Sequence, residues 1–205
     1  MALHNKVRGV SLQRLRYLKV NLTVNQTQSQ ILSAEYDFNL LVSCHWGWYA
    51  PAKAEIVTIL AHMGDNQPKI KMTLARGIIG VRTSLNPRSV IQALRALFEN
   101  DASAIQHTLK WVPIDLWTDS DIESIKKAVA TLRTMIQPSE TWRMTVETRR
   151  YTALHKIEII REAAELIDQK VDLENPNKIV RIDIIAGHAG ISVLKPSEIF
   201  SAMKA

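Results

Sequence analysis

Cysteine is almost absent from this sequence of 205 residues, because Cys44 is the only one. A single cysteine excludes an internal disulfide framework and any zinc site built from several thiolates. Long apolar runs are also missing. No stretch approaches the roughly 20 residues needed to span a bilayer, and residues 1–20 lack the apolar core of a secretory signal. We therefore expect a cytoplasmic protein with no membrane partner.

Glycine and proline are scarce, with seven of each, so the composition is not that of a long low-complexity segment. The glycine-rich motifs of nucleotide-binding enzymes are missing, because residues 76–80 have too few glycines at the wrong spacing. The G-x-S-x-G motif of hydrolases is absent too. His155 and His188 have no partners at metal-ligand spacing. The sequence therefore favours binding over catalysis, and we expect no enzyme, no cofactor and no metal site.

The chain is basic, with a formal net charge of +6 and a pI of about 9.5, which fits a polyanionic partner. The charges are unevenly spread. Residues 1–37 hold five Lys or Arg against two Asp or Glu, residues 38–118 hold eight against five, and residues 119–205 hold thirteen of each. Local clustering, and not net charge, therefore has to identify an anion-binding surface in the last part.

Residues 1–30 show no sustained hydrophobic period. Four cations make them basic: Arg8, Arg14, Arg16 and Lys19. We interpret this segment as a basic N-terminal extension that holds phosphates through charge. A solvated tail is the equal alternative.

Residues 31–118 alternate between strand and helix patterns. The predicted elements are strand 38–44, a helix from Pro51 to about Gly64, strand 69–75, a turn at Arg76-Gly77, strand 78–83, a helix from Pro87 and strand 108–117. Pro113 favours an edge position for the last strand. The β-α-β-β-α-β order predicts a ferredoxin-like domain, with two helices on one face of a four-stranded antiparallel sheet.

Residues 119–205 have the order α-β-α-β-β-α. The predicted elements are a helix capped by Thr118 or Asp119, strand 142–147, helix 152–168, strand 178–185, a turn at Gly187-His188, strand 191–194 and a short helix from Pro196. We place the boundary between the two units near 118–119. The predicted class is α+β, a ferredoxin-like βαββαβ domain followed by an α/β domain.

The densest polar signature is Arg149-Arg150, followed by Tyr151 and His155, where a strand ends and a helix is about to begin. Backbone N–H groups at a helix N-terminus favour anions, and two guanidinium groups grip phosphates well. Arg143 lies upstream, and Lys156 lies on the first helical turn. The alternative is a salt-bridged surface that includes Glu147 and Glu158.

Aromatic residues follow the first strand, at Trp46, Trp48 and Tyr49. An aromatic loop can stack bases. Packing over the end of its own sheet is the interpretation that we favour. Cys44-His45 has no oriented acid partner, so we interpret Cys44 as an inert core residue.

The C-terminal residues resemble a known family, the THUMP domain. The similar segments are Trp142–Tyr151, Ile159–Arg161, the V-D-L-x-N-P-x-K turn from Val171 to Lys178, Ile179–Ile185 and Gly190–Val193. The resemblance covers about 119–203, and the turn is its most specific part. The preceding unit is similar to the ferredoxin-like domain that accompanies THUMP domains in tRNA modification enzymes.

This resemblance implies RNA binding, with the paired domains recognising a folded tRNA. Larger family members, such as the 4-thiouridine synthetase and several methyltransferases, carry a catalytic domain as well, and we expect none here. Stand-alone proteins of this layout resemble the adaptor for N4-acetylcytidine formation, which works beside an RNA acetyltransferase. The RNA contacts that the resemblance and the charge pattern suggest are Arg143, Arg149, Arg150, Lys156, Lys178, Arg181 and Lys195, with Lys53, Lys69, Lys71, Arg76 and Arg82 from the first unit.

Two alternatives stay open from the sequence. One is binding of another structured RNA, such as ribosomal RNA. The other is a small-molecule sensor or enzyme built on the ferredoxin-like unit, which predicts a deep apolar pocket with converging polar groups. We expect no DNA partner, and another tRNA-modifying enzyme is a possible partner in place of the acetyltransferase.

Overall fold

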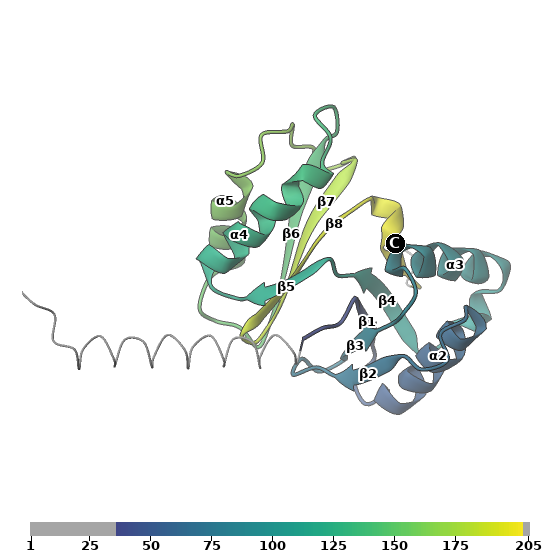
Figure 1. Cartoon of the computed structure of the whole chain (residues 1–205). Coiled ribbons are helices and arrows are strands. Elements are labelled where there is room, and N and C mark those ends of the chain that lie inside the picture. Colours follow the sequence, from purple (N-terminus) through teal and green to yellow (C-terminus); the bar gives the residue numbers. More distant parts are fainter. Residues whose placement is uncertain (1–35, 203–205) are drawn as a thin grey trace, which may run out of the picture. The chain divides into compact units, whose positions relative to one another are not determined.

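The computed structural model describes residues 36–202, and residues 37–202 belong to one compact unit. The basic extension predicted for residues 1–30 lies outside the described residues. The unit contains two β-sheets, and each sheet carries helices on one face (Figure 1). It is a mixed α and β fold with four helices over the described range.

The first sheet has five strands in the order β2-β3-β1-β4-β9, with every neighbouring pair antiparallel. Its elements are β1 (Leu40–Cys44), α2 (Tyr49–His62), β2 (Lys69–Met72), β3 (Ile78–Arg82), α3 (Pro87–Asn100), the short turn η1 (Ala102–Ala104), β4 (Thr108–Pro113) and β9 (Phe200–Ser201). The sequence predicts four strands. The fifth, β9, comes from the far end of the chain and pairs with Lys110 and Trp111 of β4.

Both helices of this part cover the same face of the first sheet. Residues of α2 and α3 share one buried core with alternate residues of the strands: Leu40, Val42, Ile56, Leu60, Ile91, Leu94 and Trp111 among others. The helix α3 starts at Pro87 because the Asn86 side chain accepts hydrogen bonds from the N–H groups of Arg88 and Ser89. Within residues 36–202, no helix has both the length and the apolar character to cross a membrane.

The second sheet has four strands in the order β5-β8-β7-β6. Its elements are β5 (Leu116–Asp119), α4 (Ile122–Leu132), the turn η2 (Arg133–Met135), β6 (Trp142–Arg149), α5 (Lys156–Ala164), β7 (Lys178–Ile185) and β8 (His188–Leu194). Strands β6 and β7 are parallel, and the other pairs are antiparallel. Parallel neighbours need a crossover connection, which α5 supplies. Together α4 and α5 cover one face (Figure 1) over a second core, which includes Ile125, Val129, Ile159, Val180 and Ile182.

The predicted strand 108–117 is in fact two strands in two different sheets. The N–H of Ile114 donates to the carbonyl oxygen of Asn39 beside β1, whereas the N–H of Asp115 donates to Ile191 on β8. The backbone therefore changes sheets between neighbouring residues. Because Leu116–Asp119 pairs with β8, the following helix begins at Ile122 and is capped by the Asp121 side chain, not by Thr118 or Asp119.

Two predicted helices are shorter than the pattern indicates. The helix 152–168 is observed as α5, Lys156–Ala164, because the Glu158 carboxylate accepts the N–H of His155 and starts the helix there. The terminal helix at Pro196 is a single turn, η3 (Pro196–Glu198). The chain then extends into β9, because Phe200 enters the first core and the N–H of Ala202 donates to Leu109.

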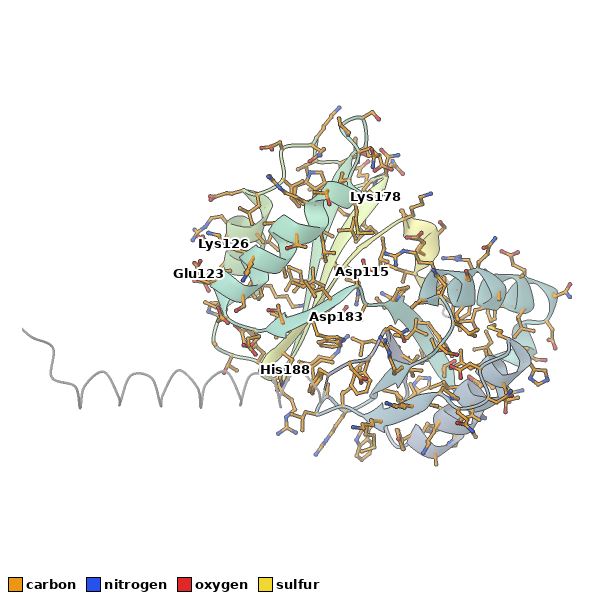
Figure 2. All side chains as sticks on the ribbon, in the orientation of Figure 1. Asp115, Glu123, Lys126, Lys178, Asp183 and His188 are labelled. Carbon is orange, nitrogen blue, oxygen red and sulfur yellow. The ribbon has the colours of Figure 1, made fainter. Side chains whose placement is uncertain are left out.

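A polar clamp around Asp115 ties the two sheets together. The Asp115 carboxylate lies 2.8 Å from Nη1 of Arg88 on α3 and accepts the N–H of Val193 on β8 at 3.0 Å. Arg88 also donates to the Val193 carbonyl at 3.2 Å and lies 3.4 Å from Glu198. Figure 2 places Asp115 where β4 gives way to β5. One carboxylate therefore holds a helix of the first sheet against a strand of the second.

We expect Asp115→Asn to lower the free energy of unfolding by about 2 kcal/mol, because hydrogen bonds to a charged group contribute about that much. Urea unfolding measures the change. The control is Arg161→Ala, because Arg161 is largely exposed and its contact with Glu162 is 3.6 Å long. That change should stay within about 0.5 kcal/mol. Equal unfolding midpoints for wild type and Asp115→Asn would contradict the importance of the clamp.

Candidate nucleic-acid interface

Strand β7 separates its side chains between two faces. Val180, Ile182 and Ile184 enter the core beneath α4 and α5. The alternate residues Arg181 and Asp183 therefore lie on the face that carries no helix, since side chains alternate along a strand. They border a small hollow that is also lined by residues of the first sheet, including Leu41, Ser43, Lys110 and Val112. The helix-free faces of the two sheets thus meet at charged side chains.

Asp183 (Figure 2) holds two guanidinium groups. Arg181 is 5% exposed and lies with Nε 2.7 Å from Oδ2 of Asp183, while its Nη2 donates to Oδ1 at 3.0 Å. Nη1 of Arg149 donates to the same Oδ1 at 3.1 Å. Arg181 was predicted as an RNA contact. Its burial contradicts this, because a guanidinium that is 5% exposed and held by Asp183 through Nε and Nη2 does not reach a surface ligand.

Lys110 is a charged residue at this interface that the sequence prediction missed. It lines the same hollow as Arg149, Arg181 and Asp183. Burial lowers the pKa of the Lys110 ammonium, and repulsion by Arg181 lowers it further, whereas Asp183 and Glu147 oppose the shift. The only signal in the sequence is one cation within the apolar strand pattern of residues 109–112.

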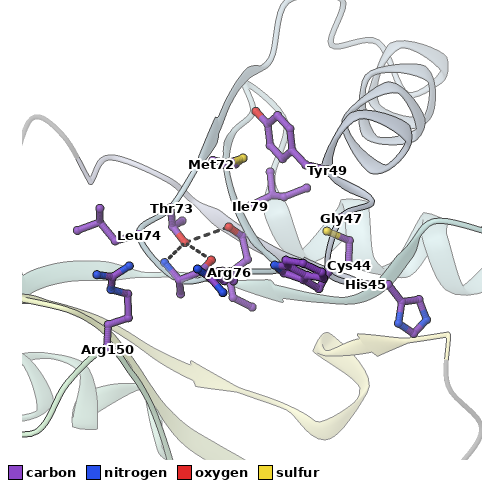
Figure 3. Close-up of a pocket in the computed structure, with 14 residues that line it drawn as sticks. Cys44, His45, Gly47, Tyr49, Met72, Thr73, Leu74, Arg76, Ile79 and Arg150 are labelled. Carbon is purple, nitrogen blue, oxygen red and sulfur yellow. Dashed lines mark hydrogen bonds between the residues drawn. The ribbon is translucent and has the colours of Figure 1, made fainter.

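Arg150 has the exposed side chain next to this charged region. Its φ is +53°, in the left-handed region that a residue with a Cβ adopts at a cost of about 1 kcal/mol. The N–H of Ala186 donates to the carbonyl of Arg149 and holds the end of β6. This geometry turns Arg150 toward the β2–β3 connection, and Figure 3 shows its side chain pointing toward Leu74. No ion pair of Arg150 is present among residues 36–202.

Arg76 approaches from the first sheet, on the tight turn between β2 and β3. The Thr73 hydroxyl donates to Ile78 at 2.9 Å and accepts the N–H of Ala75 at 3.2 Å (Figure 3). Gly77 has φ +75°, and a Cβ there would lie 2.8 Å from the carbonyl oxygen of Cys44. The turn is therefore held closely against the end of β1, and this fixes the position of Arg76.

Arg76, Lys110, Arg149 and Arg150 form what we call the cationic cluster. Arg76, Arg149 and Arg150 line one hollow together, and Lys110 adjoins Arg149 in the next. The cluster thus brings together three predicted residues, Arg76, Arg149 and Arg150, although Arg76 lies 73 positions before Arg149 in the sequence. Asp183 is ion-paired with Arg149, and Glu147 also acts on Lys110, so the four cations of the cluster outnumber these two carboxylates.

Three more predicted cations lie along β2 and β3. Lys69, Lys71 and Arg82 are exposed, and Lys69 and Arg82 are directly paired across the two strands. Lys69 and Arg82 also line a hollow with Asp65. They extend the basic surface along the edge of the first sheet. Lys53 is exposed on helix α2, which precedes these two strands in the chain.

Three of the four remaining predicted cations have local partners. Lys156 lies 3.2 Å from Glu147, and Lys178 lies 3.8 Å from Glu140. Arg143 donates to the carbonyl of Leu173 at 3.0 Å. Lys195 is exposed and borders a hollow with Arg88 and Arg95, apart from the cationic cluster. The salt-bridged alternative therefore describes the Lys156 region.

The start of α5 does not offer a free anion site beside Arg150. Helix α5 begins six positions after Arg150, and the Glu158 carboxylate already accepts the N–H of His155. Tyr151 is also occupied, because its hydroxyl donates to the carbonyl of Ser120 at 2.8 Å. A carboxylate of the protein itself thus occupies the start of this helix, where the sequence predicts a phosphate.

The aromatic loop after β1 is more exposed than expected. Trp46 is 74% exposed and Trp48 is 47% exposed, so the favoured interpretation that they pack over the sheet is wrong for Trp46. Cys44 is buried, and burial raises the pKa of its thiol, which disfavours the nucleophilic thiolate. Over the described range, no group of three His, Cys, Asp or Glu side chains could hold a metal ion.

Comparison with known proteins now identifies the second sheet. The family model for the THUMP domain matches residues 119–194. The solution structure of the THUMP domain of THUMP domain-containing protein 1 is 31% identical over 37% of this chain and 88% of its own length, with a TM-score of 0.33. Residues 119–194 therefore form a THUMP domain, and the chain is a member of the THUMP-domain proteins.

Two solved structures share the fold over a larger part of the chain. PH1313 from Pyrococcus horikoshii has a TM-score of 0.58 at 17% identity, and covers 76% of this chain and 54% of its own. TrmN from Thermus thermophilus has a TM-score of 0.52 at 14% identity, and covers 77% of this chain and 46% of its own. The chain thus spans about half the length of these structures. Comparison with curated protein sequences gives no match.

We expect Asp183→Ala to lower the free energy of unfolding by about 3 kcal/mol, because it leaves the buried Arg181 guanidinium without its counter-ion. Chemical denaturation of the purified protein measures this loss. Glu165→Ala is the matched control, since it removes an exposed carboxylate and should change stability by less than about 0.5 kcal/mol. Similar losses in the two variants would show that Asp183 is not a structural anchor.

Proposed function

We propose that this chain binds a structured tRNA through the cationic cluster. We further propose that it acts as a non-catalytic adaptor that presents the tRNA to a separate modification enzyme. The observation that carries the proposal is the meeting of two guanidinium groups that have no ion pair within residues 36–202, Arg76 from the first sheet and Arg150 from the THUMP domain. The THUMP resemblance supports RNA as the polyanion and tRNA modification as the setting.

The arrangement of the cations suits recognition of a folded RNA. Guanidinium groups bind phosphates bidentately, and Arg76 and Arg150 are exposed with no ion pair in the described part of the chain. Arg149 keeps part of its side chain exposed while Asp183 orients it. A small number of oriented contacts, spread over two sheets, recognises the shape of an RNA and not an extended sequence.

The adaptor role and the acetyltransferase partner rest on resemblance to stand-alone THUMP proteins. RNA-modifying activity by a partner requires only that this chain hold the tRNA in a defined orientation. Binding of ribosomal RNA uses the same phosphate chemistry and is the alternative to tRNA. The small-molecule alternative requires an enclosed pocket, whereas the hollow of about 470 Å³ beside the cluster has exposed side chains in its walls, including Trp46, Met72 and Leu74.

We expect the double variant Arg76→Ala with Arg150→Ala to bind tRNA about tenfold or more weakly at 0.1 M salt. The slope of log affinity against log salt should fall by about 2, because two phosphate contacts are lost. Fluorescence anisotropy with labelled tRNA, measured at several salt concentrations, gives both quantities.

The control for charge alone removes two exposed cations elsewhere, Lys127→Ala with Arg161→Ala, on α4 and α5. This variant should keep affinity within about twofold. If both double variants lose affinity equally, the binding is unspecific attraction to a basic protein. If neither loses affinity, the cationic cluster is not the binding surface.

For the adaptor role, we expect cells lacking this protein to lose one modified nucleoside from their tRNA, with N4-acetylcytidine as the first candidate. Mass spectrometry of hydrolysed tRNA measures the loss. The Arg76→Ala, Arg150→Ala gene should restore the nucleoside poorly, and the Lys127→Ala, Arg161→Ala gene should restore it fully. A tRNA nucleoside profile that does not change, together with altered ribosomal RNA, would favour the ribosomal alternative.

A further inference from the structure

A second feature adjoins the cationic cluster, an open hollow of about 470 Å³ between the aromatic loop and the β2–β3 turn (Figure 3). Trp46 lines it from the loop, Met72 and Leu74 from the turn side, and Arg76 and Arg150 from the cluster. The three apolar side chains are exposed, at 74%, 65% and 57%. Exposed large apolar side chains that gather around one concavity indicate a binding site.

The local backbone presents Trp46 to solvent. The N–H of Trp48 donates to the carbonyl of His45 at 3.1 Å, which closes a tight turn with Trp46 at an outer corner. Gly47 follows it with φ +83°, a value that glycine adopts without strain. The indole of Trp46 therefore stands on a well-defined turn and makes no ring contact with another aromatic side chain of residues 36–202.

Trp48, in the same loop, differs from Trp46 because its indole contacts another ring. Its ring lies 5.4 Å from the His107 ring. His107 is held in turn, because its N–H donates to Glu55 at 2.9 Å. Trp48 does not line the hollow. Of the two tryptophans of this loop, Trp46 is the more exposed, at 74% against 47%, and it is the one that lines the hollow.

We propose that this hollow holds one unpaired nucleobase of the bound RNA, stacked on Trp46, with adjoining phosphates on Arg76 and Arg150. The inference rests on the RNA binding proposed above and adds a contact to the base. An indole stacks on any base, because every base has a π-face. Met72 and Leu74 supply an adaptable apolar wall, and the excess of guanidinium groups at one rim favours a nucleotide over an uncharged apolar peptide.

The experiment compares wild type, Trp46→Ala, Trp46→Phe and Trp48→Ala on two ligands, unfractionated tRNA and heparin. Heparin is a polyanion without bases. Trp46→Ala should bind tRNA about 5-fold to 100-fold more weakly, with an unchanged salt slope because no phosphate contact is lost. Its affinity for heparin should stay within about twofold. Trp46→Phe should recover most of the tRNA affinity, and Trp48→Ala should bind tRNA like wild type.

Each other outcome overturns the base contact. Equal tRNA binding by Trp46→Ala and wild type leaves the cationic cluster as the binding surface but removes the stacked base. A parallel loss on tRNA and heparin means that Trp46 only shapes the charged surface. Failure of wild type to bind tRNA at low salt rejects the proposed function itself, and the melting temperature of each variant separates these cases from misfolding.

Discussion

The Asp115 carboxylate is the contact on which the arrangement of the two sheets depends. The chain leaves the first sheet at Pro113 and enters the second at Leu116, and Asp115 lies between them. Its two oxygens bind Arg88 of α3 and the backbone of β8, so neither sheet can rotate against the other without breaking charged hydrogen bonds. The cationic cluster inherits this constraint, because Arg76 and Lys110 come from the first sheet whereas Arg149 and Arg150 come from the second.

The arginine residues where the two sheets meet are of two kinds. Arg181 is buried with Nε and Nη2 bound to Asp183, and the same carboxylate orients Arg149. Arg150 and Arg76 are exposed and make no ion pair with any residue of 36–202. Burying an ion pair costs free energy because both charges lose their water, and the pair then fixes the orientation of its side chains. Exposed guanidinium groups instead attract phosphate. The proposed stacking on Trp46 adds a contact that does not depend on charge.

The hydrophobic periodicity of the sequence was sufficient to predict most of the helices and strands. The alternation over 178–185 predicts β7 at its observed bounds, and the cap and proline at Asn86-Pro87 locate the start of α3. It failed where tertiary contacts overrode the local pattern. The pattern of residues 108–117 predicts one strand. The side chains do not indicate that the N–H groups of Ile114 and Asp115 donate to different sheets. The extension after Pro196 became β9 because an open strand edge and an apolar core accept Phe200.

For the candidate site, the sequence identified Arg149 and Arg150 as a dense basic signature and identified the THUMP resemblance, because both depend on residues that are neighbours in the chain. The tertiary structure alone decided which of the cations have carboxylate partners. It also decided which of them meet across the two sheets. Arg181 and Asp183 look like an exposed charged face in a strand pattern, yet the first sheet covers them. Arg76 joins Arg150, and Trp46 stays open to solvent, because exposure and long-range contact depend on how the two sheets pack, and local sequence patterns do not record that packing.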